Sequence, residues 1–269
     1  MTAFERLAEA TPCPWQADLA HAMRILGQRE LVAGRYEEAL GHFTRAVEMY
    51  RTLPRRTAGQ EADRLKLTMD LATVYRMYDR HSAALEILQE VLPTARRWAK
   101  TNPARGETHL CTLLSNLAIA LDRAGSPPEA LETAREAVSL ARKLYAADPV
   151  VHGNALVVSL ITLAHRLARW NTQESISTAA DAVHVARQCV RYHGDAELPA
   201  LGLALRVLRE HLLGGGRPVE AIGPAREAVE ILRTLVEREP GIHGDELQDS
   251  EERLALLTSG KAVIGFHTH

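Results

Sequence analysis

The chain has 269 residues, 46% of them hydrophobic and 4% aromatic, and a formal net charge of −2. This length allows a large core, and the near-neutral charge gives no bulk electrostatic reason to expect nucleic acid as a partner. No apolar run approaches the roughly 20 residues that span a bilayer. Ala, Leu, Arg and Glu are abundant, which favours helix, and strand-forming residues do not alternate in runs. The sequence therefore predicts an all-α protein.

The first residues, 1–17, are predicted to be a short leader with a small helix at Phe4–Ala10. They lack a basic start followed by an apolar core, so a secretory signal is not expected. Three cysteines lie far apart, at Cys13, Cys111 and Cys189. Their odd number and spacing fit neither a disulfide framework nor a zinc site. We therefore expect a cytoplasmic protein in which Cys111 and Cys189 are small core residues.

Amphipathic helix pairs then follow one another along the chain. They are predicted at about 18–54, 63–101, 108–148, 155–192 and 197–239, each with an internal turn such as Gly34, Asp79–His81, Gly125–Pro128 or Gly214–Arg217. Pro93 lies inside one apolar pattern and predicts a kink there. A last helix at 246–257 has no partner, and its acidic first turns suit a solvated capping helix. The tail, 259–269, shows no clear pattern.

The helix pairs are copies of one unit. The aliphatic residue that opens each second helix recurs at intervals of 45, 46, 45 and 46 residues, at Leu40, Leu85, Leu131, Ile176 and Ile222. A small residue precedes each of them: Ala39, Ala84, Ala130, Ser175 and Ala221. A small residue allows the two helices of a pair to approach closely. One pair cannot bury its apolar faces alone, so the pairs are predicted to stack.

At these residues the chain resembles tetratricopeptide-repeat proteins. That family pairs an aliphatic and a small residue in the first helix, as Leu71-Ala72, Leu117-Ala118 and Leu163-Ala164 do here. The usual period is about 34 residues, so the longer unit is similar to the variety found in kinesin light chains and actinobacterial proteins. Asn102-Pro103-Ala104 is similar to the linker of the actinobacterial sort. The fifth repeat departs from the pattern, because Leu208-Arg209 stands where a small residue is expected.

The resemblance implies a right-handed superhelical α-solenoid of five antiparallel helix pairs plus a C-terminal capping helix, with the first helices lining an inner groove. Such proteins usually bind peptides or partner proteins, and actinobacterial members often belong to signalling or defence-related proteins. The resemblance implies no cofactor.

Residues of the first helices that lie off the core stripe are predicted to face this groove. They are Arg24, Gln28, Lys66, Thr73, Arg76, Ser115, Asp122, Arg123, His165, Arg169, Arg206 and Glu210. Most of the charged ones are basic, so the groove is expected to attract an acidic peptide or a C-terminal carboxylate. Arg76, Arg123 and Arg169 are the predicted contacts. The alternative is that they are ordinary solvated arginines.

Other motifs favour structural explanations. His152-Gly153-Asn154, His193-Gly194-Asp195 and His243-Gly244-Asp245 are expected in successive inter-repeat loops, where Gly followed by Asp or Asn starts a helix. Gly214–Gly216 and Ser259-Gly260-Lys261 lack the full phosphate-loop pattern and are expected to be turns. His267 and His269 belong to the tail. No catalytic, cofactor or metal site is predicted.

Two functions remain open for the chain. The first is a non-enzymatic scaffold that binds a peptide segment of another protein. The second is a regulator, in signalling, defence or secondary-metabolism control, that responds to a small molecule or peptide and acts on a separate effector chain. An enzyme on this scaffold lacks any recognisable group of residues. Neither nucleic acid nor a membrane is expected as a partner, and pairing of two copies through the end repeats stays open.

Overall fold

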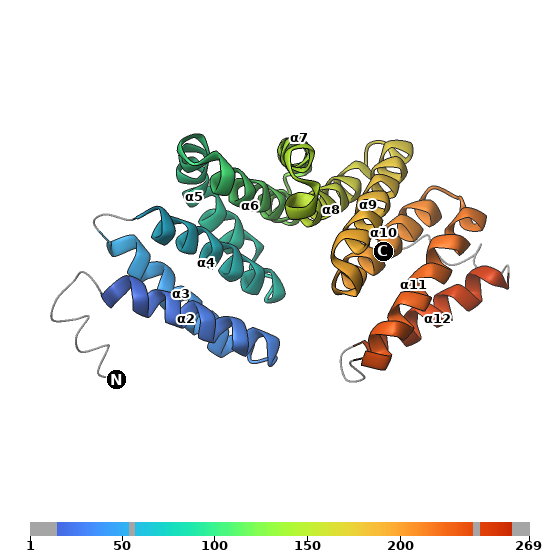
Figure 1. Ribbon diagram of the computed structural model, residues 1–269, viewed down its shortest axis with the longest axis horizontal. Helices are drawn as coiled ribbons and strands as arrows, with labels where there is room; N and C mark the ends of the chain where they lie inside the picture. Colours follow the sequence, from blue (N-terminus) through green and yellow to red (C-terminus); the bar gives the residue numbers. More distant parts are fainter. Residues whose placement is uncertain (1–14, 54–56, 239–242, 260–269) are drawn as a thin grey trace. The chain divides into compact units, whose positions relative to one another are not determined.

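The computed structural model describes residues 15–53, 57–238 and 243–259, and every regular element in these ranges is a helix (Figure 1). The predicted all-α fold is confirmed. The leader helix expected at Phe4–Ala10 and the tail beyond residue 259 lie outside the described residues. The α-helices are α2 (Trp15–Val32), α3 (Tyr36–Thr52), α4 (Ala58–Met77), α5 (His81–Thr101), α6 (Pro103–Arg123), α7 (Pro127–Ala147), α8 (Pro149–Leu167), α9 (Thr172–His193), α10 (Leu198–Gly214), α11 (Pro218–Arg238) and α12 (Gly244–Thr258), with a 3-10 turn, η1 (Gly194–Glu197), before α10.

The chain divides into two compact units, residues 1–130 and 131–269. In the first unit, α2 packs on α3, α4 on α5, and α5 on α6, and the first helices α2, α4 and α6 also touch in succession. In the second unit, α8 packs on α9, α9 on α10, and α10 on α11, while α8 also touches α10. The last helix, α12, packs on α11, as predicted for a capping helix.

The predicted small residues are completely buried in the second helices. Ala39, Ala84, Ala130, Ser175 and Ala221 are all 0% exposed. The first helix supplies the matching close approach: a Cβ atom on Gly27 of α2 would collide with the ring of Phe43 in α3. The repeat unit inferred from the sequence is therefore the packing unit of the fold.

The helices are longer than the sequence analysis predicted, and the loops between repeats are shorter. A single residue, Asn102, separates α5 from α6, and Asp148 alone separates α7 from α8. Pro103 and Pro149 occupy the first turns of the following helices, where a missing N–H costs nothing. Asp148 also caps α8 by accepting from the Val151 N–H at 3.0 Å. The residues beyond the usual repeat length thus extend helices.

This difference corrects the prediction for the first His-Gly motif, which was expected in an inter-repeat loop. His152, Gly153 and Asn154 lie inside α8, and Gly153 is buried against Cys189 of α9, where any Cβ would collide with the sulfur. The next motif ends α9: His193 Nε2 donates to the Val150 carbonyl at 2.8 Å, and Gly194 has a φ of 70°. His243 precedes α12 without capping it through its side chain. Gly194 and Gly244 begin η1 and α12, as predicted, so the predicted helix start is wrong only for Gly153.

Four of the five turns inside the helix pairs share one hydrogen-bond pattern. At Gly34, Asp79, Gly125 and Gly216 the backbone has a positive φ. The N–H of each of these residues bonds back to the third preceding carbonyl, and the next N–H bonds to the fifth, as in Gly125 to Asp122 and Ser126 to Leu121. This Schellman motif closes the end of the first helix. The fourth turn, Ala168–Asn171, has no positive φ, and Asn171 instead caps α9 by accepting from the Glu174 N–H at 3.0 Å.

Proline and apolar composition also shape individual helices. α5 continues through Pro93, where a kink was predicted, without interruption.

α8 is long and apolar enough to pass a length-and-composition test for a membrane span, although half of the tested window is buried in the protein. Burial of this kind is common for the core helix of a repeat protein, because a helix apolar on several sides packs against several neighbours.

Ser175 replaces alanine in the fourth copy of the small position and connects three elements. Its hydroxyl donates to the Ala164 carbonyl at 3.0 Å, so it must accept from His211 Nδ1 at 2.8 Å. The His211 ring lies edge-on to His165, with centroids 5.1 Å apart. Burial, and then the neighbouring His165, lower the pKa of His211 to about 4. His211 is therefore neutral at physiological pH.

The first prediction concerns the Gly125 turn. Gly125→Ala should lower the free energy of unfolding by about 1–2 kcal/mol, because an L side chain is strained at its φ of 87° although no atom lies near the added Cβ. Gly41→Ala is the matched control inside α3, where the Cβ also meets nothing and the change should stabilise by about 0.5–1 kcal/mol. Urea unfolding of both variants measures the difference, and equal effects would contradict the motif.

The second prediction concerns pH. An unfolded histidine titrates near 6.5, whereas His211 titrates near 4 in the fold. The unfolded chain therefore binds more protons between these values, and stability should fall by up to about 3 kcal/mol as the pH drops from about 6.5 to about 4. His211→Gln should flatten this part of the curve in urea titrations, and the exposed His184→Gln should leave it unchanged. An unchanged slope in His211→Gln would refute the assignment.

Candidate functional site

The predicted groove residues of the first unit belong to different environments. Arg24 is 8% exposed, and its Nη1 lies 3.8 Å from Asp70 Oδ2 of α4. Gln28 Nε2 donates to the same oxygen at 2.8 Å. Burial raises the pKa of Asp70, against the opposing effects of Arg24, Gln28 and Lys66. Arg24 and Gln28 are thus already bound within the protein, to an acid that the sequence analysis did not single out.

Two hydroxyl groups of the predicted set bond to their own helices. Thr73 Oγ1 donates to the Met69 carbonyl at 3.0 Å. Ser115 is 2% exposed, and its Oγ donates to the Cys111 carbonyl at 3.1 Å. Cys111 itself is buried and belongs to no disulfide among the described residues, as expected for a core residue. Neither hydroxyl offers a free donor to a ligand.

Arg76 and Arg123 form a different arrangement, at the ends of the neighbouring first helices α4 and α6. Arg76 is half-buried, and burial together with the Arg123 cation lowers its pKa. Within the described residues, neither arginine forms an ion pair with an acid. Lys66 and Arg123 are exposed, and Asp122 beside Arg123 is half-buried. Two cations therefore lie close together, and no acid of the described residues forms an ion pair with either of them.

Arginines of the second helices show the opposite behaviour. They form ion pairs with the next second helix, over separations of 39 or 40 residues. The pairs join Arg51 to Glu90, Arg142 to Asp181 and Arg187 to Glu227. Exposed pairs of this kind stabilise by at most about 1 kcal/mol each. These three arginines of the second helices are thus compensated, unlike the pair on α4 and α6.

In the second unit, the predicted residues are again distributed. Arg169 is exposed in the turn after α8, which ends at Leu167. His165 is half-buried beside His211, and its Nδ1 donates to the Ile161 carbonyl at 2.8 Å. In the fifth repeat, Arg209 occupies the small-residue position and is 2% exposed, with Nη2 3.5 Å from Glu210.

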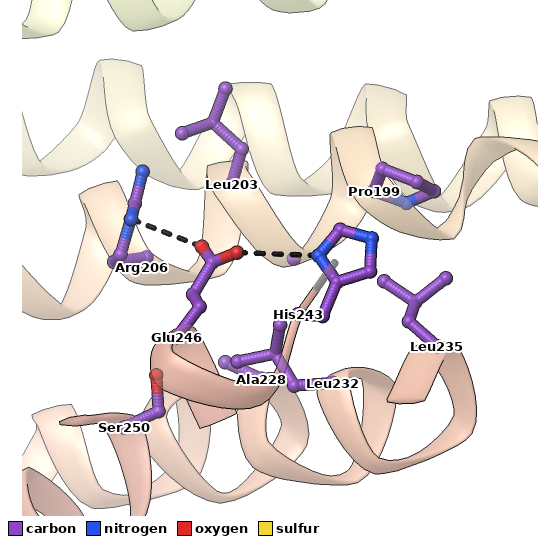
Figure 2. Close-up of a pocket in the computed structure, with 10 residues that line it drawn as sticks. Pro199, Leu203, Arg206, Ala228, Leu232, Leu235, His243, Glu246 and Ser250 are labelled. Atoms are coloured by element: carbon purple, nitrogen blue, oxygen red, sulfur yellow. Dashed lines mark hydrogen bonds and ion pairs between the residues drawn. The ribbon is translucent and has the colours of Figure 1, made fainter. Parts of the chain in front are cut away.

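Arg206 lines a cavity of about 230 Å³ between α10, α11 and α12 (Figure 2). Its Nη1 lies 3.1 Å from Glu246 Oε1 of α12, and His243 Nδ1 lies 3.5 Å from the second oxygen of the same carboxylate. Apolar side chains form the other walls, chiefly Leu232 and Leu235 of α11. The cavity therefore has a polar edge, where the charges of Arg206 and Glu246 balance each other.

No group of three or more His, Cys, Asp or Glu side chains that could hold a metal ion exists in the part of the chain that the structure describes. Cys189 is buried, which raises the pKa of its thiol. These surroundings do not activate it as a nucleophile. Cys13 lies outside the described residues.

The comparison with protein families matches residues 110–149 to the tetratricopeptide repeat family. A comparison with curated protein sequences gave no match. Solved structures with a similar fold include BtubC (BKLC) from P. vanneervenii, with a TM-score of 0.63, 15% identity and 86% of each chain covered. A putative kinesin light chain from Podosopora anserina, with nearly identical TPR-like repeats, has a TM-score of 0.58 and 19% identity, covering 83% of this chain and 98% of that one.

A Rap protein complexed with competence and sporulation factor has a TM-score of 0.54 and 14% identity, covering 89% of this chain and 64% of that one. At these identities the likeness concerns the fold. Together with the repeat unit described above, it confirms the predicted α-solenoid. Residues 110–149 thus match a tetratricopeptide repeat, and the fold of the chain is similar to that of solved proteins with TPR-like repeats.

Proposed function

We propose that the chain is a non-enzymatic scaffold that binds a peptide segment of a partner protein along the first helices of its repeats. Arg76 and Arg123 hold an acidic side chain or the C-terminal carboxylate of that segment. The observation that carries the proposal is the pair itself: two neighbouring arginines, one half-buried, without an acid among the described residues.

The electrostatics of the pair supports an anionic ligand. Burial and mutual repulsion both disfavour the charged form of Arg76, which is why its pKa is lowered. A bound carboxylate would offset both effects, because it replaces lost hydration and lies between two like charges. Arginine forks bind carboxylates through two parallel hydrogen bonds. The charged form of Arg76 is thus unfavourable in the protein without ligand, and an acidic ligand would remove this unfavourable free energy.

The fold supports the same proposal. Helical-repeat solenoids present extended surfaces made of several repeats, and they use these surfaces for binding. α4 and α6 belong to consecutive repeats and touch each other, so a peptide held at Arg76 and Arg123 crosses both.

The Rap likeness supports a second candidate, a regulator that responds to a ligand and acts on a separate effector chain. That protein was solved with a bound factor. In this function the ligand would change the arrangement of the repeats. Small-angle scattering with and without ligand distinguishes the two candidates, since the scaffold keeps its radius of gyration and the regulator changes it.

The third prediction tests the arginine pair. Peptides selected from a displayed random library against the whole chain should be enriched in Asp, Glu or acidic C-termini. Their affinity should fall at least ten-fold in Arg76→Glu/Arg123→Glu, because attraction becomes repulsion, and it should weaken as salt rises. Fluorescence anisotropy measures both effects.

The matched control carries the same charge change on the second helices, as Arg191→Glu/Arg226→Glu, where both residues are exposed. It should bind the selected peptides as the unaltered chain does. Arg169→Glu tests the third predicted contact separately in the second unit. Equal affinity of Arg76→Glu/Arg123→Glu and the control, with unchanged helicity in both, would refute the proposed site.

A further inference from the structure

The cavity of the second unit has a specific origin in the fifth repeat. Gly202 of α10 lines it. The corresponding positions, seven residues before the small residue of each earlier first helix, are Ala20, Leu65, Cys111 and Val157, and all four are at most 1% exposed. The fifth repeat thus omits a core side chain that its predecessors possess.

Packing does not require glycine at this position. A Cβ on Gly202 would meet only Ile231 Cγ2, at an ordinary 3.5 Å. Glycine inside a helix costs roughly 0.5–1 kcal/mol relative to alanine. The chain therefore gives up stability where it leaves space, which is typical of a functional site rather than of a core.

The polar edge of the cavity has one unused group. The two oxygens of Glu246 face Arg206 at 3.1 Å and His243 Nδ1 at 3.5 Å (Figure 2). A carboxylate only accepts, so the tautomer that suits this contact carries its proton on Nδ1. The Nε2 atom then carries a lone pair, and it points away from Glu246 toward Pro199 (Figure 2). The described residues form no hydrogen bond with His243 Nε2.

We propose that this cavity receives the ring of a Trp or Tyr side chain from a bound polypeptide, which donates its N–H or O–H to His243 Nε2. The inference rests on the proposed function of peptide binding. The volume of about 230 Å³ is below the range of drug-sized ligand pockets, roughly 300–1,000 Å³, and suits a single side chain.

The lining selects the chemistry of that side chain. Leu203, Leu232 and Leu235 offer apolar surface to a ring. A charged group would gain little, because Arg206 and Glu246 already neutralise each other. A purely apolar group would leave His243 Nε2 buried without a partner, which costs free energy. An aromatic ring with one donor satisfies both the walls and the edge.

The test uses the whole chain and three probes: N-acetyl-tryptophanamide, N-acetyl-phenylalaninamide and the 1-methylindole analogue of the tryptophan compound. Titrations followed by NMR of the leucine methyl groups should show saturable binding of the tryptophan compound, at least ten-fold tighter than that of the other two. Equal binding of the three, or no saturable binding, would overturn the proposal. Free L-tryptophan binding more tightly than the amide would also overturn it, since it would indicate a metabolite instead of a polypeptide.

Variants distinguish loss of binding from loss of folding, and they distinguish this cavity from the site at Arg76 and Arg123. Gly202→Val restores the side chain of the fourth repeat, so it should raise the melting temperature and abolish binding of the tryptophan compound; Gly202→Ala is the smaller alternative. His243→Phe should remove the preference over the methylated analogue. Unchanged binding in either Gly202 variant, with intact helicity, contradicts the site. Arg76→Glu/Arg123→Glu should bind the tryptophan compound normally, so that failure of one site does not imply failure of the other.

Discussion

The fold depends on one steric constraint, the close approach of the two helices in each pair. Every second helix places a side chain no larger than serine at that point, and each of these is 0% exposed. A larger side chain would separate the helices and leave voids, which close-packed interiors do not tolerate. Because one pair cannot bury its remaining apolar faces, the constraint at one residue leads to stacking of successive pairs. The buried Arg209 shows that the fifth repeat meets the constraint differently, next to the capping helix.

The same stacking determines which charges remain available to a ligand. Successive second helices bring arginines and acids together, whereas no acid of the described residues forms an ion pair with Arg76 or Arg123 on the first helices. The cavity at Gly202 is a second departure from the repeat, because one copy lacks a core side chain. In a protein built from copies, such local departures from the pattern mark the candidate sites more clearly than any motif.

The sequence was sufficient for the repeat unit, since the small residues and their spacing act within one helix pair. It was insufficient for the connections, because Pro103 and Pro149 start helices where loops were expected. It also predicted that several groove residues are available to a ligand, although they are already bound within the protein. Arg24 and Gln28 are bound by Asp70, and Arg206 by Glu246, acids that stacking supplies from 40 or more residues away. Searching for acids about one repeat downstream would have revealed these partners, whereas the His165–His211 contact depends on side-chain geometry that spacing does not give.

The central claim is that a ligand lies along the first helices and is held at Arg76 and Arg123. Hydrogen–deuterium exchange of the whole chain, with and without a selected acidic peptide, tests it most directly. We expect slower exchange in the C-terminal turns of α4 and α6, where these arginines lie, with little change in α3 and α5. Protection confined to the second helices, or absent from α4 and α6 at saturating peptide, would contradict it.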